Sequence, residues 1–375
     1  MKKVIIFSPS RMDDGNYHIE LFNELSRKFH LTVAAVSREC RLSKKINFDV
    51  VHFALPDYTQ LKDMTEDEFS AFNAGVMSIV SGFDVVIWPM MPQYRVIETA
   101  KEIQTACRLI FWGIGVAASY NTRFDSVEYT APSFMDMISI SDAVVFYTDY
   151  PYKKYESQGA DTRKMFVAPN TVYVKHTDFP ANMEDKNIIL FVGSLYPQKR
   201  VDVLIEHYGK AFHKNKNVPD LIIIGDGECR LEIQESVNKN GLNEKVSLLG
   251  EIYDEERLSQ YFLHALAVVS PDQAGLSVLK SMGYGAPFIT KKDAISGGEI
   301  LNIANGVNGV LFDEFSELEA IISDMAENKM KYIEMGKNAK EFYWTFRPIS
   351  VKAEGLADAI EYAASKTKSS DRDHA

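Results

Sequence analysis

A repeated alternation of short apolar runs and amphipathic segments constrains the fold most strongly. The apolar runs are continuous and rich in β-branched residues, a pattern typical of parallel strands that are buried on both faces. The intervening segments have helical periodicity, so the alternation predicts parallel sheets with helices on both sides. The runs are Val4–Ser8, Leu31–Val36, Val50–Phe53, Val85–Trp88, Leu109–Trp112, Ala143–Tyr147, Phe166–Ala168, Ile188–Val192, Leu221–Ile224, Val246–Leu249, Ala267–Ser270, Pro287–Thr290 and Val310–Phe312. The helical segments include Tyr17–Phe29, Arg95–Thr105, Val201–Phe212, Arg257–Leu263 and Leu276–Met282.

The alternation restarts near residue 187, which predicts two domains in a chain of 375 residues. The polar segment Lys175–Lys186 contains Pro180 and has no periodicity, so we interpret it as the linker. The predicted fold class is therefore α/β, with two Rossmann-like domains. Their bounds are residues 1–178 and 187–345.

Charge and cysteine content restrict the partners and the compartment. The net charge is −11, from 41 basic and 52 acidic residues, and neither half of the chain is basic. This argues against a nucleic-acid partner, whereas a local contact with a membrane surface stays open. The three cysteines lie far apart without metal-ligand spacing, which favours free thiols in a reducing cytoplasm. No apolar stretch approaches the roughly 20 residues of a membrane-spanning helix.

The first motif is Gly-Asp-Gly-Glu at residues 225–228, between an apolar run and a helical segment. Gly225 and Gly227 at such a turn would let backbone N–H groups approach a phosphate. A plain turn that tolerates glycine is the competing interpretation.

The second motif is GSLYPQKR at residues 193–200, in the first loop of the second domain. Ligands of open α/β sheets bind beyond the carboxyl ends of the strands, which is where this loop would lie. Lys199 and Arg200 could there neutralise a diphosphate. The alternative is a solvated pair of cations.

The third motif, residues 270–287, joins a strand to a helix that begins near Leu276. Its first turn would offer the N–H groups of Gly275, Leu276 and Ser277 to an anion. A fourth piece, Gly297-Gly298-Glu299, is predicted to cover the same ligand, with Glu299 facing the sugar or the diphosphate.

In this order, GSLYPQKR, GDGE, SPDQAGLSVLKSMGYGAPFIT and NGVNGVLF resemble the second domain of GT-B glycosyltransferases of the large retaining family 4, the group 1 glycosyl transferases. The resemblance implies a GT-B fold, with two domains facing a central cleft and a C-terminal helix at about 346–365 that returns to the first domain. It also implies a metal-independent retaining hexosyltransferase. Its donor would be a UDP- or GDP-linked sugar, with no further cofactor, and its acceptor a glycan or a lipid-linked glycan. Such enzymes commonly act in bacterial surface polysaccharide or glycoconjugate synthesis, in the cytoplasm or at the inner membrane face.

The sequence departs from the family pattern at several positions. The family pair E-x7-E falls on Asp272, which the resemblance places by the donor sugar, and on Lys280, which it places near the ribose or base. A lysine has only donors, so we expect Lys280→Glu to be tolerated or to improve ribose binding. Ser194 stands where the family has arginine, Lys199 is kept, and Arg200 replaces a glycine. Lys199 and Asp272 are the predicted catalytic residues.

The resemblance places the acceptor on the first domain. The predicted contacts are Gly15, Asn16 and His18 at a helix start, and Gly113 and Gly115. His18 is equally well interpreted as a core or surface histidine, and Ile114 stands where related enzymes often have a histidine. The departures motivate a second hypothesis, a GT-B pseudoenzyme or partner subunit that binds a nucleotide or another transferase without turnover. A sugar-nucleotide epimerase is a third.

Overall fold

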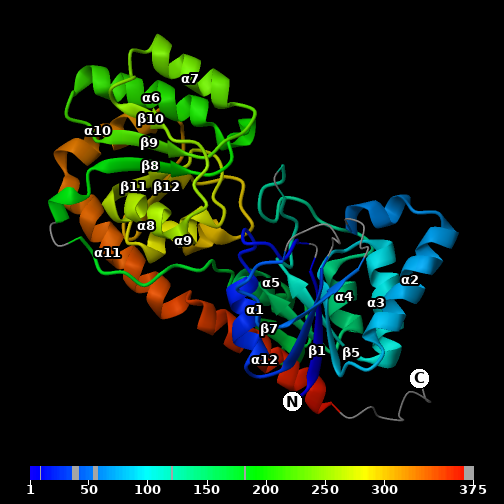
Figure 1. Ribbon diagram of the computed structural model, residues 1–375. Coiled ribbons are helices and arrows are strands. Elements are labelled where there is room, and N and C mark those ends of the chain that lie inside the picture. The colour runs from blue at the N-terminus through cyan, green and yellow to red at the C-terminus, as the bar shows by residue number, and fades with distance from the viewer. Residues whose placement is uncertain (9, 36–41, 54–57, 120, 181–182, 367–375) are drawn as a thin grey trace. The chain divides into compact units, whose positions relative to one another are not determined.

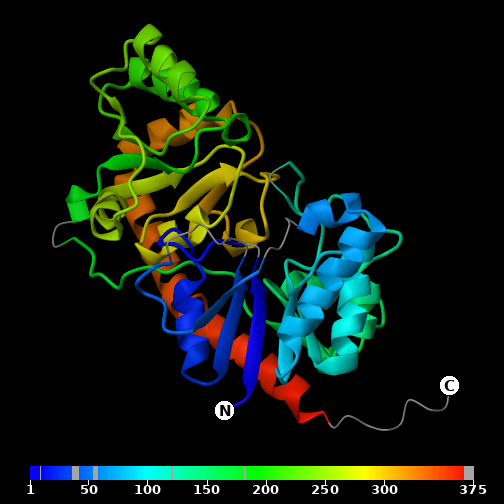
Figure 2. The ribbon, with the colours of Figure 1, turned by 45° about the vertical axis from the view of Figure 1, so that its right-hand side comes forward.

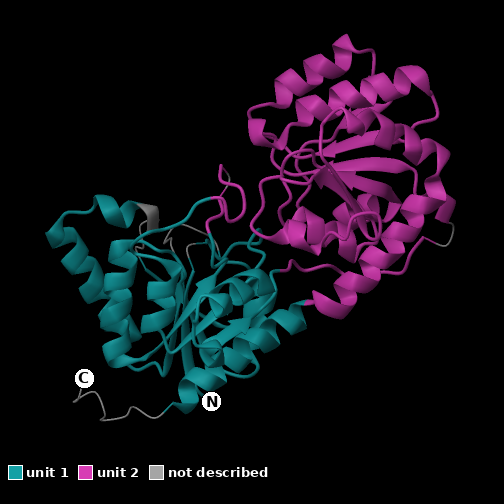
Figure 3. Ribbon diagram, turned by 180° about the vertical axis from the view of Figure 1, so that it is seen from behind, with its two compact units in different colours: residues 1–116, 127–170, 349–375 teal, residues 117–126, 171–348 magenta. Residues whose placement is uncertain are grey.

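The computed structural model describes residues 1–8, 10–35, 42–53, 58–119, 121–180 and 183–366. The chain forms two compact units (Figure 3). Unit 1 comprises residues 1–116, 127–170 and 349–375, and unit 2 comprises residues 117–126 and 171–348. The boundary thus lies a few residues before the predicted linker. The short segment 117–126, which the sequence had placed in the first domain, packs with unit 2.

Unit 1 is built on a parallel seven-stranded sheet with the order β3-β2-β1-β4-β5-β6-β7. Neighbouring strands are in parallel register; Val4, for example, is paired with Leu31 on one side and with Val85 on the other. The strands are β1 (Lys3–Ser8), β2 (His30–Ala35), β3 (Asp49–His52), β4 (Val85–Pro89), β5 (Arg108–Gly113), β6 (Ala143–Phe146) and β7 (Met165–Val167).

Two layers of helices cover the faces of this sheet (Figures 1 and 2). One face packs against α2 (Glu66–Val80), α3 (Tyr94–Ala106), α4 (Phe134–Ile140) and α5 (Asp149–Ser157). The other face packs against α1 (Ile19–Ser26) and the C-terminal α12 (Ile349–Ser365), which lie side by side. The prediction of a helix near 346–365 is confirmed, and that helix completes the core of unit 1.

Unit 2 has a parallel six-stranded sheet with the order β10-β9-β8-β11-β12-β13. The strands are β8 (Ile188–Val192), β9 (Asp220–Ile224), β10 (Val246–Leu248), β11 (Ala265–Val269), β12 (Phe288–Lys291) and β13 (Gly309–Phe312). One face packs against α6 (Val201–Lys214), α7 (Arg230–Lys239), α10 (Glu317–Glu327) and the start of α11 (Lys329–Phe346). The other face packs against α8 (Glu255–His264), α9 (Ser277–Gly283) and the end of α11.

Every predicted apolar run forms a strand at the expected place within the described residues, with ends shifted by at most two positions. The reason is visible in β8, whose Ile189, Leu190 and Phe191 are completely buried between helices on both faces. The prediction of an α/β fold with two Rossmann-like domains is therefore confirmed. Val36, the last residue of one predicted run, and Cys40 lie outside the described residues.

Candidate functional site

The loops that carry the predicted motifs follow neighbouring strands at the carboxyl edge of the unit 2 sheet. Residues 193–200 follow β8, residues 225–229 follow β9, and residues 270–276 follow β11. Since β9, β8 and β11 are adjacent in the sheet, these three loops meet at one edge. Ligands of open parallel sheets bind at this edge, so the fold brings the motifs to one candidate site.

Gly225 and Gly227 are needed for close contact between the loop 193–200 and the loop 225–229. A Cβ on Gly225 would lie 1.9 Å from the carbonyl oxygen of Gly193, and one on Gly227 would lie 2.5 Å from that of Leu195. Both glycines have positive φ, 143° and 154°. The amide of Gly225 already donates to Gly250 O at 2.9 Å, and that of Gly227 donates to the Asp226 carboxylate at 2.7 Å. These glycines therefore have a packing role, and a phosphate contact through them stays a prediction.

Lys199 is a nearly buried cation that ends the short 3₁₀ turn Pro197–Lys199 after β8. The residue is only 8% exposed, and burial lowers the pKa of its ammonium to about 8. Its Nζ lies 5.6 Å from the centre of the Tyr196 ring and has no hydrogen-bond acceptor within the described part of the chain. A desolvated ammonium without an acceptor is suited to bind an anion.

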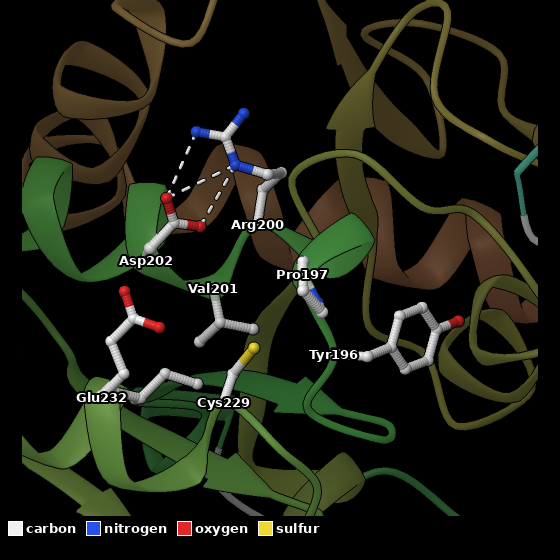
Figure 4. A pocket seen from close by; sticks show the side chains of 8 residues that line it. Tyr196, Pro197, Arg200, Val201, Asp202, Cys229 and Glu232 are labelled. Carbon is white, nitrogen blue, oxygen red and sulfur yellow. Dashed lines mark hydrogen bonds and ion pairs between the residues drawn. The ribbon is translucent and has the colours of Figure 1, made fainter.

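Arg200, the next residue, is directed elsewhere. It adopts a left-handed conformation (φ 52°), and its guanidinium donates to the Asp202 carboxylate at 3.2 Å. Figure 4 shows this pair on the wall of a pocket of about 290 Å³, with the Tyr196 ring pointing away. The structure therefore distinguishes the two adjacent cations, because among the described residues Arg200 has a partner carboxylate and Lys199 has none. The pocket is lined by Tyr196, Pro197, Arg200, Val201, Asp202, Cys229, Glu232 and Ile233.

The loop after β11 is braced on both sides. The Ser270 hydroxyl donates to Gln273 O at 2.8 Å, the Ala274 amide donates to Ile295 O at 2.8 Å, and the Tyr196 hydroxyl donates to the Gln273 side chain. The amides of Gly275 and Leu276 have no acceptor among the described residues. The following helix, α9, begins at Ser277 and has seven residues, so these individual amides, rather than a long helix dipole, would contact an anion.

Asp272 lies in this braced loop with one oxygen, Oδ1, buried and without a hydrogen-bond donor within the described residues. Burial raises the pKa of its carboxyl, while the nearby cations Arg123 and Lys291 oppose that shift. Arg123 comes from the segment 117–126 and forms an ion pair with Asp293, which also pairs with Lys291 at 3.1 Å. An acceptor oxygen without a donor can accept a hydrogen bond from a hydroxyl group of a polyhydroxylated ligand.

Lys280 is already paired inside unit 2. Its Nζ donates to the Glu255 carboxylate at 2.6 Å, and the Tyr284 hydroxyl donates to the other Glu255 oxygen at 2.6 Å. This finding changes the expectation that the ammonium is available for a ribose or a phosphate. It also reverses the expected effect of Lys280→Glu, because the new carboxylate would face the Glu255 carboxylate.

Glu299 differs from its prediction as well. It is 6% exposed, and its Oε2 accepts hydrogen bonds from the amide of Gly297 at 2.9 Å and the Ser296 hydroxyl at 3.3 Å. Ser296 in turn donates to Ala274 O at 2.7 Å. The carboxylate thus holds its own loop against the loop after β11 and is turned away from solvent.

The predicted acceptor residues of unit 1 have clear local roles. The Asn16 side chain accepts from the His18 amide at 2.7 Å and donates to Arg11 O at 2.6 Å, which fixes the entry into α1 after the Gly15 turn. A Cβ on Gly113 would lie 2.8 Å from Met90, and one on Gly115 would lie 2.5 Å from the Phe146 ring. Acceptor binding at these positions stays a prediction.

His18 is buried, 7% exposed, among aromatic rings, with Trp112 at 5.1 Å between ring centres. Neither ring nitrogen has a hydrogen-bond partner among the described residues. Burial, and secondly the charge of Lys352, lower the pKa of His18 well below its usual value, so the imidazole is neutral at physiological pH. The structure thus places His18 in the core at the start of α1.

Sequence reasoning missed Glu255, Tyr284 and Arg123. Glu255 and Lys280 are 25 positions apart and on different helices, so no local pattern links them. Arg123 lies in a segment without periodicity. Within the described ranges, no group of three or more His, Cys, Asp or Glu residues could hold a metal ion, and no helix is long and apolar enough to cross a membrane.

Solved structures show which fold this is. The chain is similar to the Anabaena HepE structure in complex with UDP-glucose, with a TM-score of 0.66, 15% identity and coverage of 96% of this chain and 100% of that chain. A glycosyltransferase from Rickettsia africae matches with a TM-score of 0.68, 13% identity and coverage of 97% and 100%. At these identities the likeness shows the fold alone, which is GT-B. The predicted fold is confirmed.

The sequence comparison identifies a matching protein family for most of unit 2. Residues 175–342 match the family described as glycosyl transferases, group 1. An uncharacterized glycosyltransferase of Methanocaldococcus jannaschii is 30% identical over 168 residues, which are 43% of this chain and 44% of that protein. The poly(ribitol-phosphate) alpha-N-acetylglucosaminyltransferase of Staphylococcus aureus is 24% identical over 182 residues, 48% of this chain and 35% of that protein. The chain thus spans less than half the length of these curated relatives.

Proposed function

We propose that the protein is a retaining glycosyltransferase that moves a sugar from a UDP- or GDP-linked donor to a glycan or lipid-linked acceptor, without a metal ion. The observation that carries this proposal is Lys199 at the carboxyl edge of the unit 2 sheet, a residue only 8% exposed whose ammonium has no acceptor among the described residues. The match of residues 175–342 to the group 1 family supports it. The names of the S. aureus relative and of the UDP-glucose complex support a nucleotide-sugar donor and a polymeric acceptor.

The roles follow from the charges. Lys199 and the amides of Gly275 and Leu276 bind the diphosphate and stabilise the charge that grows on it as the sugar departs. The Asp272 carboxylate accepts a hydrogen bond from a hydroxyl group of the donor sugar and stabilises the positive charge on the sugar in the transition state. The acceptor binds to unit 1. Retention of the anomeric configuration is checked by NMR of the product.

Binding and turnover are tested separately on the full chain. Lys199→Ala should weaken binding of UDP or GDP, measured by calorimetry, by about 1.5–3 kcal/mol, the scale of a lost hydrogen bond to a charged group. Lys292→Ala is the matched control, because that lysine lies on the same sheet edge but is 69% exposed and pairs with Asp313. An unchanged affinity of Lys199→Ala for UDP and GDP would contradict the role of Lys199 on which the proposal rests.

Turnover is followed as nucleoside diphosphate released from UDP- and GDP-sugars with glycan and lipid-linked acceptors. Asp272→Asn should preserve nucleotide affinity and lower kcat, because the lost charge acts mainly in the transition state. Nucleotide binding without turnover with every donor and acceptor pair would support the pseudoenzyme hypothesis instead.

A further inference from the structure

Glu255 is held in a fixed orientation by Lys280 in α9 and by Tyr284, the residue that follows this helix. One carboxylate oxygen accepts from Lys280 Nζ at 2.6 Å, and the other accepts from the Tyr284 hydroxyl at 2.6 Å. Tyr284 is completely buried, so its hydroxyl is fixed by the core. The Lys280 and Glu255 side chains remain 17% and 30% exposed, so the carboxylate is oriented from within and reachable from solvent.

The pairing leaves acceptor capacity on both oxygens. A carboxylate has about four lone-pair sites, and the two donors occupy one on each oxygen. Two adjacent hydroxyl groups could therefore donate to this carboxylate together, one to each oxygen. A vicinal diol is the chemical group that matches this pattern.

The position of Glu255 suits the nucleoside end of the donor. Glu255 opens α8, directly after the loop 249–254 that follows β10, and Lys280 lies about one turn into α9. β10 is the edge strand, two positions from β8. Tyr253, in the same loop, is 79% exposed and offers an aromatic face to a flat ring. A nucleotide whose diphosphate lies at the β8 and β11 loops can extend its nucleoside toward this edge.

We propose that the Glu255 carboxylate, oriented by Lys280 and Tyr284, accepts the two ribose hydroxyls of the nucleoside diphosphate. This inference rests on the proposed function, since it names the residue that recognises the ribose of the same donor. Lys280 acts as a positioning residue, and the ribose hydroxyls donate to Glu255.

The test compares ribonucleotides with deoxynucleotides on the full-length protein by calorimetry. The probes are UDP and GDP with their 2′-deoxy and 3′-deoxy forms. The wild type should bind the ribonucleotide roughly 10- to 100-fold more tightly than either deoxy form, as expected for a hydrogen bond to a charged group. In Glu255→Ala this ratio should fall below about threefold, because affinity for the ribonucleotide drops to that for the deoxy forms. Lys280→Met should lower the same ratio, because the carboxylate loses one of its two anchors.

Glu256→Gln is the matched control. Glu256 is the neighbouring residue on α8, is 67% exposed and pairs with Lys175 at the surface. This variant should keep the wild-type ratio. Glu255→Gln, which retains one acceptor oxygen and the shape of the side chain, guards against loss of folding and should give an intermediate ratio.

The outcomes separate this inference from the proposed function. If the wild type binds neither UDP nor GDP, both are overturned. If it binds one of them but Glu255→Ala and Glu255→Gln keep the wild-type ratio, only the ribose assignment is overturned, and the Glu255–Lys280 pair is a brace between α8 and α9.

Discussion

Reversing the charge of Lys280 should destabilise unit 2. In Lys280→Glu the ion pair with Glu255, now 2.6 Å between Nζ and oxygen, becomes a contact between two carboxylates. Two unit charges about 4 Å apart interact by about 4 kcal/mol at an effective dielectric constant near 20. Because the two side chains are 17% and 30% exposed, solvent screens part of this energy. We therefore expect a loss of about 2–4 kcal/mol in the free energy of unfolding.

Thermal unfolding followed by circular dichroism measures this loss. One kcal/mol shifts the Tm of a unit of 150–250 residues by about 2–4 °C, so Lys280→Glu should lower it by roughly 5–15 °C. The double variant Glu255→Lys with Lys280→Glu restores opposite charges and should recover at least half of the loss. Lys292→Glu, at an exposed position, should change the stability by less than about 0.5 kcal/mol. A Tm of Lys280→Glu within 2 °C of the wild type would refute this account of the pair, by the same conversion.

Three further predictions follow from the same loops. Gly225→Ala should lower the free energy of unfolding by about 3 kcal/mol or more, because its Cβ would lie 1.9 Å from Gly193 O. Gly241 also has positive φ, but its Cβ would meet no described atom within 4 Å, so Gly241→Ala should lower it by about 1–2 kcal/mol. Urea unfolding measures both values. Nucleotide affinity should fall by about twofold between pH 7 and 8 and then by up to about tenfold per pH unit, because the Lys199 ammonium, with a pKa of about 8, loses its proton; Lys199→Arg should abolish the fall in calorimetry. Ser296→Ala should lower the free energy of unfolding by about 1–3 kcal/mol, because the Gly298 and Ile300 amides lose their acceptor; an unchanged urea midpoint would contradict this.

The fold was predictable from the sequence because its signal is local. Each strand of these sheets is buried on both faces, so a strand such as Ile188–Val192 appears as an uninterrupted apolar run whatever its neighbours are. The positions of three motif loops follow from the fold, since residues 193–200, 225–229 and 270–276 each come directly after a strand. The sequence therefore predicted which loops meet at one edge of the sheet, and ligand binding there stays a prediction.

The direction of individual side chains was not predictable, because it depends on residues that are distant in the chain. The sequence predicts that Glu299 faces a ligand, but its carboxylate accepts a hydrogen bond from the Gly297 amide and the residue is buried. Lys280 was expected to be available, but Glu255 on another helix binds it. The glycine motif at residue 225 was interpreted through phosphate binding, yet the structure shows a backbone contact with Gly193 that requires glycine. In each case a tertiary contact decides the role.

Lys199 and Arg200 show how the fold distinguishes two neighbouring cations. Arg200 pairs with Asp202 at the surface. Lys199 is nearly buried and has no acceptor in the part of the chain that the structure describes, and lowering its pKa from 10.5 to about 8 corresponds to about 3 kcal/mol of weakened solvation. An anion bound at Nζ would offset this cost, which is similar to the binding energy that we expect Lys199→Ala to remove. The fold therefore keeps a poorly solvated charge at the carboxyl edge of the sheet. A diphosphate bound there would gain an ion pair with Lys199 and would stabilise the folded protein.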